Sequence, residues 1–128
     1  MKPLTSEWVE KAEDDYRSAL RELRARKDPN YNGACFHAQQ CVEKYLKGRL
    51  QEEEIAFRKT HFLPTILGLL GPVEPLWQAW REELTALSAY AVNFRYPGES
   101  ADKAMAREAV RICKVVRAEV RRSLGLEP

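Results

Sequence analysis

Apolar residues recur at steps of three and four along most of the chain, which is the spacing of an amphipathic helix. The first such stretch covers about residues 6–26, and its apolar face is formed by Trp8, Ala12, Tyr16, Ala19 and Leu23. Acidic residues crowd the first half of this stretch and basic residues its end, an order that complements the helix dipole. Pro29 follows directly and predicts the end of the helix, because proline cannot continue one.

Four further helices are expected, and no stretch has the pattern of a strand. The second helix begins near Asn30 or Asn32, either of which could cap it, and runs through Leu50 into the acidic residues 52–54. The remaining three cover about residues 62–70, 75–93 and 101–124. Gly71 and Pro72 form a strong stop signal after the third helix, and Ser100 is expected to cap the last one.

Long helices joined by short connections predict one all-α domain over residues 1–128. We expect an antiparallel up-and-down four-helix bundle, with the short third helix as an additional element. The chain is long enough to close one core without disulfides. Its three cysteines, an odd number, do not suggest a disulfide framework, and each is expected to be a small buried apolar residue. Trp77, Trp80 and Tyr90 are expected to be anchors of the core or of a dimer interface.

The composition narrows the class of protein. The longest apolar run is a few residues, far short of the roughly 18 needed to span a membrane. The first residues lack the apolar core of a signal peptide, so we expect a cytoplasmic protein that does not contact a membrane. The net charge of +2 is too small to indicate nucleic acid by itself.

The last expected helix nevertheless carries a basic stripe at steps of three and four. Its members are Lys103, Arg107, Arg111, Lys114, Arg117 and Arg121. Such a stripe is either an electrostatic surface for RNA or an acidic partner, or a solvated helix face partly offset by Glu108 and Glu119.

The segment 34–47 is the most informative part of the chain, because polar side chains stand beside its buried stripe. These side chains are His37, Gln40, Glu43, Lys44 and Lys47. Each one that is half-buried must find a partner, since an unpaired buried polar group costs roughly 1–3 kcal/mol. His37 is expected to be satisfied by a neighbouring side chain rather than to bind a metal.

No catalytic machinery accompanies this segment. No serine or cysteine is tied by local spacing to a base and an orienting acid. Two histidines without paired cysteines do not make a metal site. We therefore expect no catalytic residue, no metal and no cofactor. The sequence leaves open whether the protein is an enzyme and favours that it is not.

Four landmarks follow one another along the chain. They are Phe36-His37-Ala38-Gln39-Gln40, then Val42-Glu43-Lys44-Tyr45-Leu46-Lys47, then Lys59-Thr60-His61, and then Tyr90-Ala91 leading to Arg95-Tyr96-Pro97-Gly98. In this order and rough spacing the chain resembles the HEPN domain family, named for higher eukaryotes, prokaryotes and nucleotide binding. The resemblance covers nearly the whole chain. It implies an all-α bundle that is usually a homodimer and often stands beside a partner with a minimal nucleotidyltransferase fold.

Several families of that clan are RNA-cutting toxins or defence ribonucleases, which use an arginine, a polar residue and a histidine, with four to six residues between the arginine and the histidine. This chain departs from that motif. Neither His37 nor His61 has an arginine at the required distance upstream, and no histidine follows Arg95. Phe62 also stands where the family commonly has an acidic residue. Ribonuclease activity is therefore not carried over to this chain.

The sequence thus favours a nucleotide-binding or interaction module, expected as a homodimer with a nucleotidyltransferase-type protein. The candidates for holding phosphates are Lys44, Lys47, Lys59, His61 and Arg95, with Tyr96 stacking on a base and His37, Gln40 and Glu43 supporting them. Simpler interpretations stay open: Thr60 and His61 could fix a loop, and Arg95 could pair with Glu43. The alternative function is a toxin–antitoxin or defence component that acts on RNA without the usual ribonuclease motif.

Overall fold

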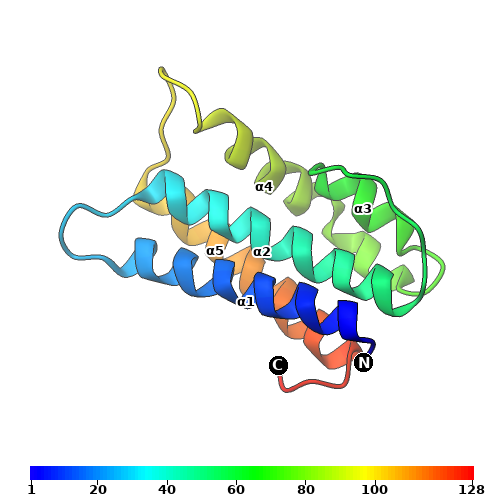
Figure 1. The fold of residues 1–128 in the computed structure, drawn as a ribbon. Coiled ribbons are helices and arrows are strands. Elements are labelled where there is room, and N and C mark those ends of the chain that lie inside the picture. The colour runs from blue at the N-terminus through cyan, green and yellow to red at the C-terminus, as the bar shows by residue number, and fades with distance from the viewer.

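The computed structural model describes residues 1–128 and contains helices but no strand, which confirms the all-α prediction. The elements are α1 (Pro3–Arg24), α2 (Tyr31–Glu52), α3 (Leu63–Leu69), the 3₁₀ helix η1 (Pro75–Trp80), α4 (Arg81–Asn93) and α5 (Lys103–Ser123). Helix α2 is the central element, because it contacts α1, α3, α4 and α5 (Figure 1). None of the helices combines the length and the apolar character needed to cross a membrane.

The two candidates for the cap of α2, Asn30 and Asn32, have different roles in the structure. Asn30 caps α2, since its Oδ1 accepts the Gly33 N–H at 2.8 Å. Asn32 instead accepts the Ala101 N–H at 2.7 Å and ties the start of α5 to α2. The prediction of Ser100 as the cap of α5 is wrong, because Asp102 accepts the Met105 N–H at 2.8 Å and the helix begins at Lys103, two residues later than expected.

The fourth predicted helix is two elements rather than one. Residues from Pro75 form η1, and the α-helix begins only at Arg81. In a 3₁₀ helix the side chains at i and i+3 eclipse, and Trp77 and Trp80 accordingly stack with ring centroids 5.4 Å apart. Trp77 is buried in the core, whereas Trp80 and Tyr90 are partly buried against it. The burial of this large aromatic pair explains why the tight turn persists at that point.

The core is one cluster of apolar side chains to which every element contributes. All three cysteines are free and buried, as expected. Helices α1 and α2 pack most extensively against each other, and Gly48 permits their close approach. A Cβ atom at Gly48 would lie 3.2 Å from the Cβ of Trp8, closer than ordinary van der Waals contact.

Candidate functional site

A buried ion pair lies on the inner face of α2. Lys47 donates from Nζ to Glu43 Oε2 at 2.9 Å, and both side chains are buried. The two residues are one helical turn apart, the spacing at which side chains on one face meet. Lys47 Nζ also lies 5.8 Å from the ring centroid of Trp8 and 5.9 Å from that of Phe57. The Glu43 carboxylate and the faces of the Trp8 and Phe57 rings therefore compensate the buried positive charge of Lys47.

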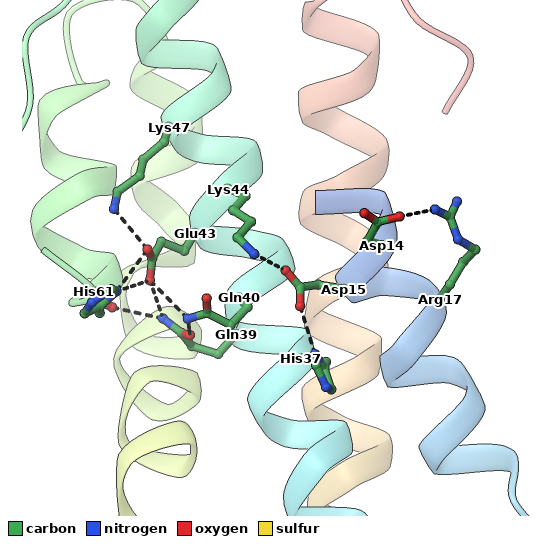
Figure 2. Close-up of polar contacts among 10 residues, drawn as sticks. All are labelled: Asp14, Asp15, Arg17, His37, Gln39, Gln40, Glu43, Lys44, Lys47 and His61. Atoms are coloured by element: carbon green, nitrogen blue, oxygen red, sulfur yellow. Dashed lines mark hydrogen bonds and ion pairs between the residues drawn. The ribbon is translucent and has the colours of Figure 1, made fainter. Parts of the chain in front are cut away.

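The Glu43 carboxylate also contacts the connection between α2 and α3. His61 Nδ1 lies 3.0 Å from both Glu43 oxygens, and Gln39 donates from Nε2 to Glu43 Oε1 at 3.2 Å. Gln39 also donates to the His61 carbonyl at 3.0 Å, and Gln40 donates to Gln39 Oε1 at 2.8 Å. Figure 2 shows these side chains converging on Glu43. The polar side chains of segment 34–47 are thus partnered, as their burial requires.

This network corrects one interpretation drawn from the sequence. The partners of Glu43 are Lys47 and His61, and the suggested pairing of Arg95 with Glu43 does not occur. The side chain of His61 is 79% exposed although its Nδ1 is held by a buried carboxylate. Its Nε2 atom therefore stays free to meet a ligand or solvent.

A second polar cluster joins α1 to α2. Asp15 is buried, and its Oδ1 lies 2.8 Å from His37 Nδ1 (Figure 2). Lys44 donates to the other oxygen of the same carboxylate. The prediction that a neighbouring side chain satisfies His37 is confirmed. Asp15 had not been singled out as part of a site, although its spacing from Ala12 and Ala19 places it on the apolar face of α1.

A groove of about 500 Å³ opens between α2, the start of α3 and α4. Its lining includes Phe36, Gln40, His61, Phe62, Val92 and Arg95. The Arg95 guanidinium carbon lies 5.7 Å from the ring centroid of Phe36, and no carboxylate lies within ion-pair distance of it. Phe62 and Val92 are 50% and 57% exposed, so apolar side chains remain open on the rim. The groove combines cationic and polar donors with aromatic walls, which suits a ligand that is anionic at one end and planar at the other.

The groove brings together some of the predicted site residues and leaves others apart. His61, Arg95 and Gln40 line it, and Glu43 supports it from below. Lys44 and Lys47 are held in the two ion pairs described above. Lys59 and Tyr96 are exposed outside its lining. No three His, Cys, Asp or Glu side chains converge in a way that would hold a metal ion.

The basic stripe on α5 is divided by ion pairs. Arg117 donates from Nε and Nη2 to the two Glu13 oxygens at 2.7 and 2.6 Å, and Arg121 lies 3.5 Å from the same carboxylate. Arg111 pairs with Glu83 and Glu108. Three of the six residues of the stripe therefore form intramolecular ion pairs. The other three, Lys103, Arg107 and Lys114, have no carboxylate within ion-pair distance.

Glu13 is the acidic centre between α1, α2 and α5. Tyr45 donates its hydroxyl to Glu13 Oε2 at 2.7 Å. Burial by itself would raise the pKa of the Glu13 carboxyl, but the hydrogen bonds from Arg117 and Tyr45 outweigh burial and lower that pKa. Burial and the hydrogen bond to Glu13 raise the pKa of the Tyr45 hydroxyl. The role of this cluster is to join three helices.

Comparison with known proteins agrees with this architecture. The solved structure of TT1696 from Thermus thermophilus matches with a TM-score of 0.79 and 23% identity, over 92% of this chain and 96% of that one. The solved structure of ST0689, described as an archaeal HEPN homologue, matches with a TM-score of 0.75 and 25% identity, over 97% of this chain and 99% of that one. A search of curated proteins found no match. The HEPN domain profile matches residues 5–123, which is nearly the whole chain, and the chain therefore belongs to the HEPN domain family.

Proposed function

We propose that the protein is a nucleotide-binding module that works as a homodimer beside a nucleotidyltransferase-type protein. The observation that carries this proposal is the groove in which Arg95 and His61 stand next to the aromatic walls Phe36 and Phe62. Membership of the HEPN family is compatible with such a role. The proposal concerns binding, because neither the sequence nor the groove supplies a nucleophile with its base.

The cationic side chains of the groove suit a phosphate group. Arg95 is free of carboxylates, and its contact with Phe36 holds the guanidinium in place without using its hydrogen-bond donors. A guanidinium so placed can bind two phosphate oxygens at once. His61 adds its Nε2 atom, which becomes a donor when the ring is protonated. The Glu43 contact at Nδ1 fixes the ring for this purpose.

The aromatic side chains of the groove suit a base. Phe36 and Phe62 offer aromatic surface, and stacking of a base on an aromatic side chain contributes about 1–3 kcal/mol. Lys59 and Tyr96 stand outside the groove, so in this proposal they contribute less than Arg95. Lys44 and Lys47 would first have to leave their ion pairs. This ranking differs from the equal roles that the sequence suggested for these residues.

The test is an isothermal calorimetric titration of the protein with nucleoside mono-, di- and triphosphates. Arg95→Ala should weaken binding of the best nucleotide at least tenfold, a loss of about 1.4 kcal/mol. Lys59→Ala should change it less. Arg58→Ala is the matched control, because Arg58 is equally exposed and has no ion pair. Unchanged affinity in Arg95→Ala, with helicity intact, would exclude the groove as the nucleotide site.

The partner is tested by purifying the tagged protein from its native host and identifying bound proteins and nucleotides by mass spectrometry. A stoichiometric nucleotidyltransferase-type protein supports the paired arrangement. A homodimer that carries only a nucleotide supports a free-standing binding module. Growth arrest of the host on expression would instead favour the alternative in which the protein acts on RNA.

A further inference from the structure

Unpaired basic side chains gather at one end of the bundle, where α1 ends and α5 begins. Arg24, Arg26, Lys103 and Arg107 line a cleft of about 640 Å³. The apolar and aromatic part of its wall comes from Leu23, Pro29 and Tyr31. We call this the α1–α5 cleft. It lies by the turn between α1 and α2 (Figure 1), and it shares no residue with the groove described above.

These four cations differ from three arginines of the basic stripe on α5, although Lys114 of that stripe is also unpaired. Arg111, Arg117 and Arg121 each have a carboxylate partner, whereas none of the four has a carboxylate within ion-pair distance. Asp102, which precedes Lys103 in the sequence, is the N-cap of α5, and its Oδ1 accepts the Met105 N–H. Four like charges therefore line one cleft, and none of them is paired with a carboxylate.

The helix dipole favours Arg24 at the end of α1, but it does not explain why α5 adds two further cations to the same cleft. All four side chains belong to exposed residues, so they add nothing to the core. Lys103 is the first residue of α5, where a cation is unfavourable beside the positive end of the helix dipole. The cations also come from segments far apart in the sequence, the 24–26 turn and the 103–107 turn of α5. The cost of collecting them is offset if an anion binds between them.

We propose that the α1–α5 cleft binds the phosphate backbone of a single-stranded nucleic acid. Arginine and lysine side chains that track phosphates, beside an aromatic ring on which a base can stack, are the usual elements of such sites. Tyr31 supplies the ring and is half-buried, so its orientation is fixed. Leu23 is half-buried as well. No apolar side chain projects from the cleft in the way that insertion into a lipid surface requires.

The test measures fluorescence anisotropy of labelled uridine RNA and thymidine DNA, each of about 12 nucleotides, against the full chain. Four phosphate contacts predict a slope of about −2.8 in log affinity against log salt, a weakening of about 50-fold between 50 and 200 mM salt. Arg26→Gln combined with Arg107→Gln should halve that slope to about −1.4 and weaken binding at least tenfold at low salt. Whether RNA or DNA binds more tightly identifies the natural strand.

A matched control removes the same amount of charge elsewhere. Lys11→Gln combined with Arg58→Gln changes two exposed residues that have no ion pair. Lys11 lies about 20 Å along α1 from Arg24. This control should stay within twofold of the parent affinity, and Arg95→Ala should also leave strand binding unchanged, which separates this cleft from the nucleotide groove. Tyr31→Leu, which keeps an apolar side chain, should weaken binding about fivefold or more.

Three results would overturn the proposal. The first is no binding of either strand at 50 mM salt. The second is equal weakening by the cleft variant and the control variant, which would reduce the effect to net charge. The third is binding to phosphatidylserine vesicles that depends on Arg26 and Arg107 as strongly as strand binding does, which would make the cleft a membrane contact. Circular dichroism of each variant checks that the helices are intact.

Discussion

At the scale of single residues, Glu43 is the counter-ion of the ammonium group of Lys47, which α2 buries. One of its oxygens accepts from Lys47 Nζ, and the side of the carboxylate turned to α3 contacts His61 and Gln39. Loss of its charge would leave the Lys47 ammonium buried among Trp8 and Phe57 without a counter-ion. Breaking one side of a buried pair is far more costly than replacing both sides by apolar groups.

Glu43→Gln should therefore lower the free energy of unfolding by about 3–5 kcal/mol, measured by urea denaturation at neutral pH. The amide keeps the shape and part of the hydrogen bonding, so the loss reports the missing charge. Glu43→Met combined with Lys47→Met should be less destabilised than Glu43→Gln alone, because no unpaired ion remains. A single variant as stable as the parent protein would mean that Lys47 leaves the interior or loses its proton at little cost.

At the scale of elements, the ion pair between Glu13 and Arg117 joins α1 to α5, which are far apart in the sequence. The pKa of Glu13 in the folded protein lies below its ordinary value of 4.5. At pH values above 4.5, the ionised carboxyl of Glu13 therefore stabilises the folded state. This contribution is complete above about pH 5 and is lost as the pH falls through the lower, folded pKa.

Glu13→Gln should consequently destabilise the protein by about 1–3 kcal/mol at pH 7, because it removes charged hydrogen bonds from Arg117 and leaves a partly buried guanidinium. Thermal unfolding at several pH values measures the effect. The difference between variant and parent should be constant down to about pH 5 and should shrink below pH 4.5. Glu10→Gln, at an exposed and unpaired position, should show neither effect.

The same scale shows what the sequence can and cannot predict. Helical periodicity and stop signals predicted every long helix, because the apolar stripes of α1, α2 and α5 have one clear period. The division between η1 and α4 was missed, since the three-residue spacing of Trp77 and Trp80 fits the apolar face of an α-helix as well as a 3₁₀ turn. The cap of α5 was missed because Ser100 and Asp102 are both good caps, and the Asn32 contact to Ala101 decides between them.

Side-chain partners were harder to predict than helices. The sequence indicates that the polar residues of α2 need partners, but it does not say which carboxylate faces which cation. Lys44 and Lys47 were therefore grouped with the phosphate-binding candidates, whereas the structure engages them with Asp15 and Glu43. The long-range pairing of Glu13 with Arg117 likewise depends on how α1 crosses α5, which local spacing leaves undetermined.

At the scale of the whole molecule, the surfaces that remain open are separate and of different character. The groove beside α4 has an apolar rim, whereas the α1–α5 cleft is lined by cations. Helix α4 lies on the opposite side of α2 from α1, so its outer face is left uncovered (Figure 1). Val92 and Phe62 open onto this side. Phe62 is assigned to a base in the proposed function, so we place the second copy of the proposed homodimer over Val92 on this side.

The homodimer predicts a mass in solution of twice the 14.8 kDa of one chain, measured by light scattering during size-exclusion chromatography. Val92→Glu should shift this mass toward that of a single chain, because burying a carboxylate between two copies costs free energy even though the unpaired Arg95 lies three residues away. The change should leave the fold intact, since Val92 is more than half exposed. Leu76→Glu is the control, because Leu76 is 87% exposed on η1 and does not line the groove. Dissociation by Leu76→Glu but not by Val92→Glu would move the interface to η1, and a single-chain mass for the parent protein would remove the homodimer from the proposed function.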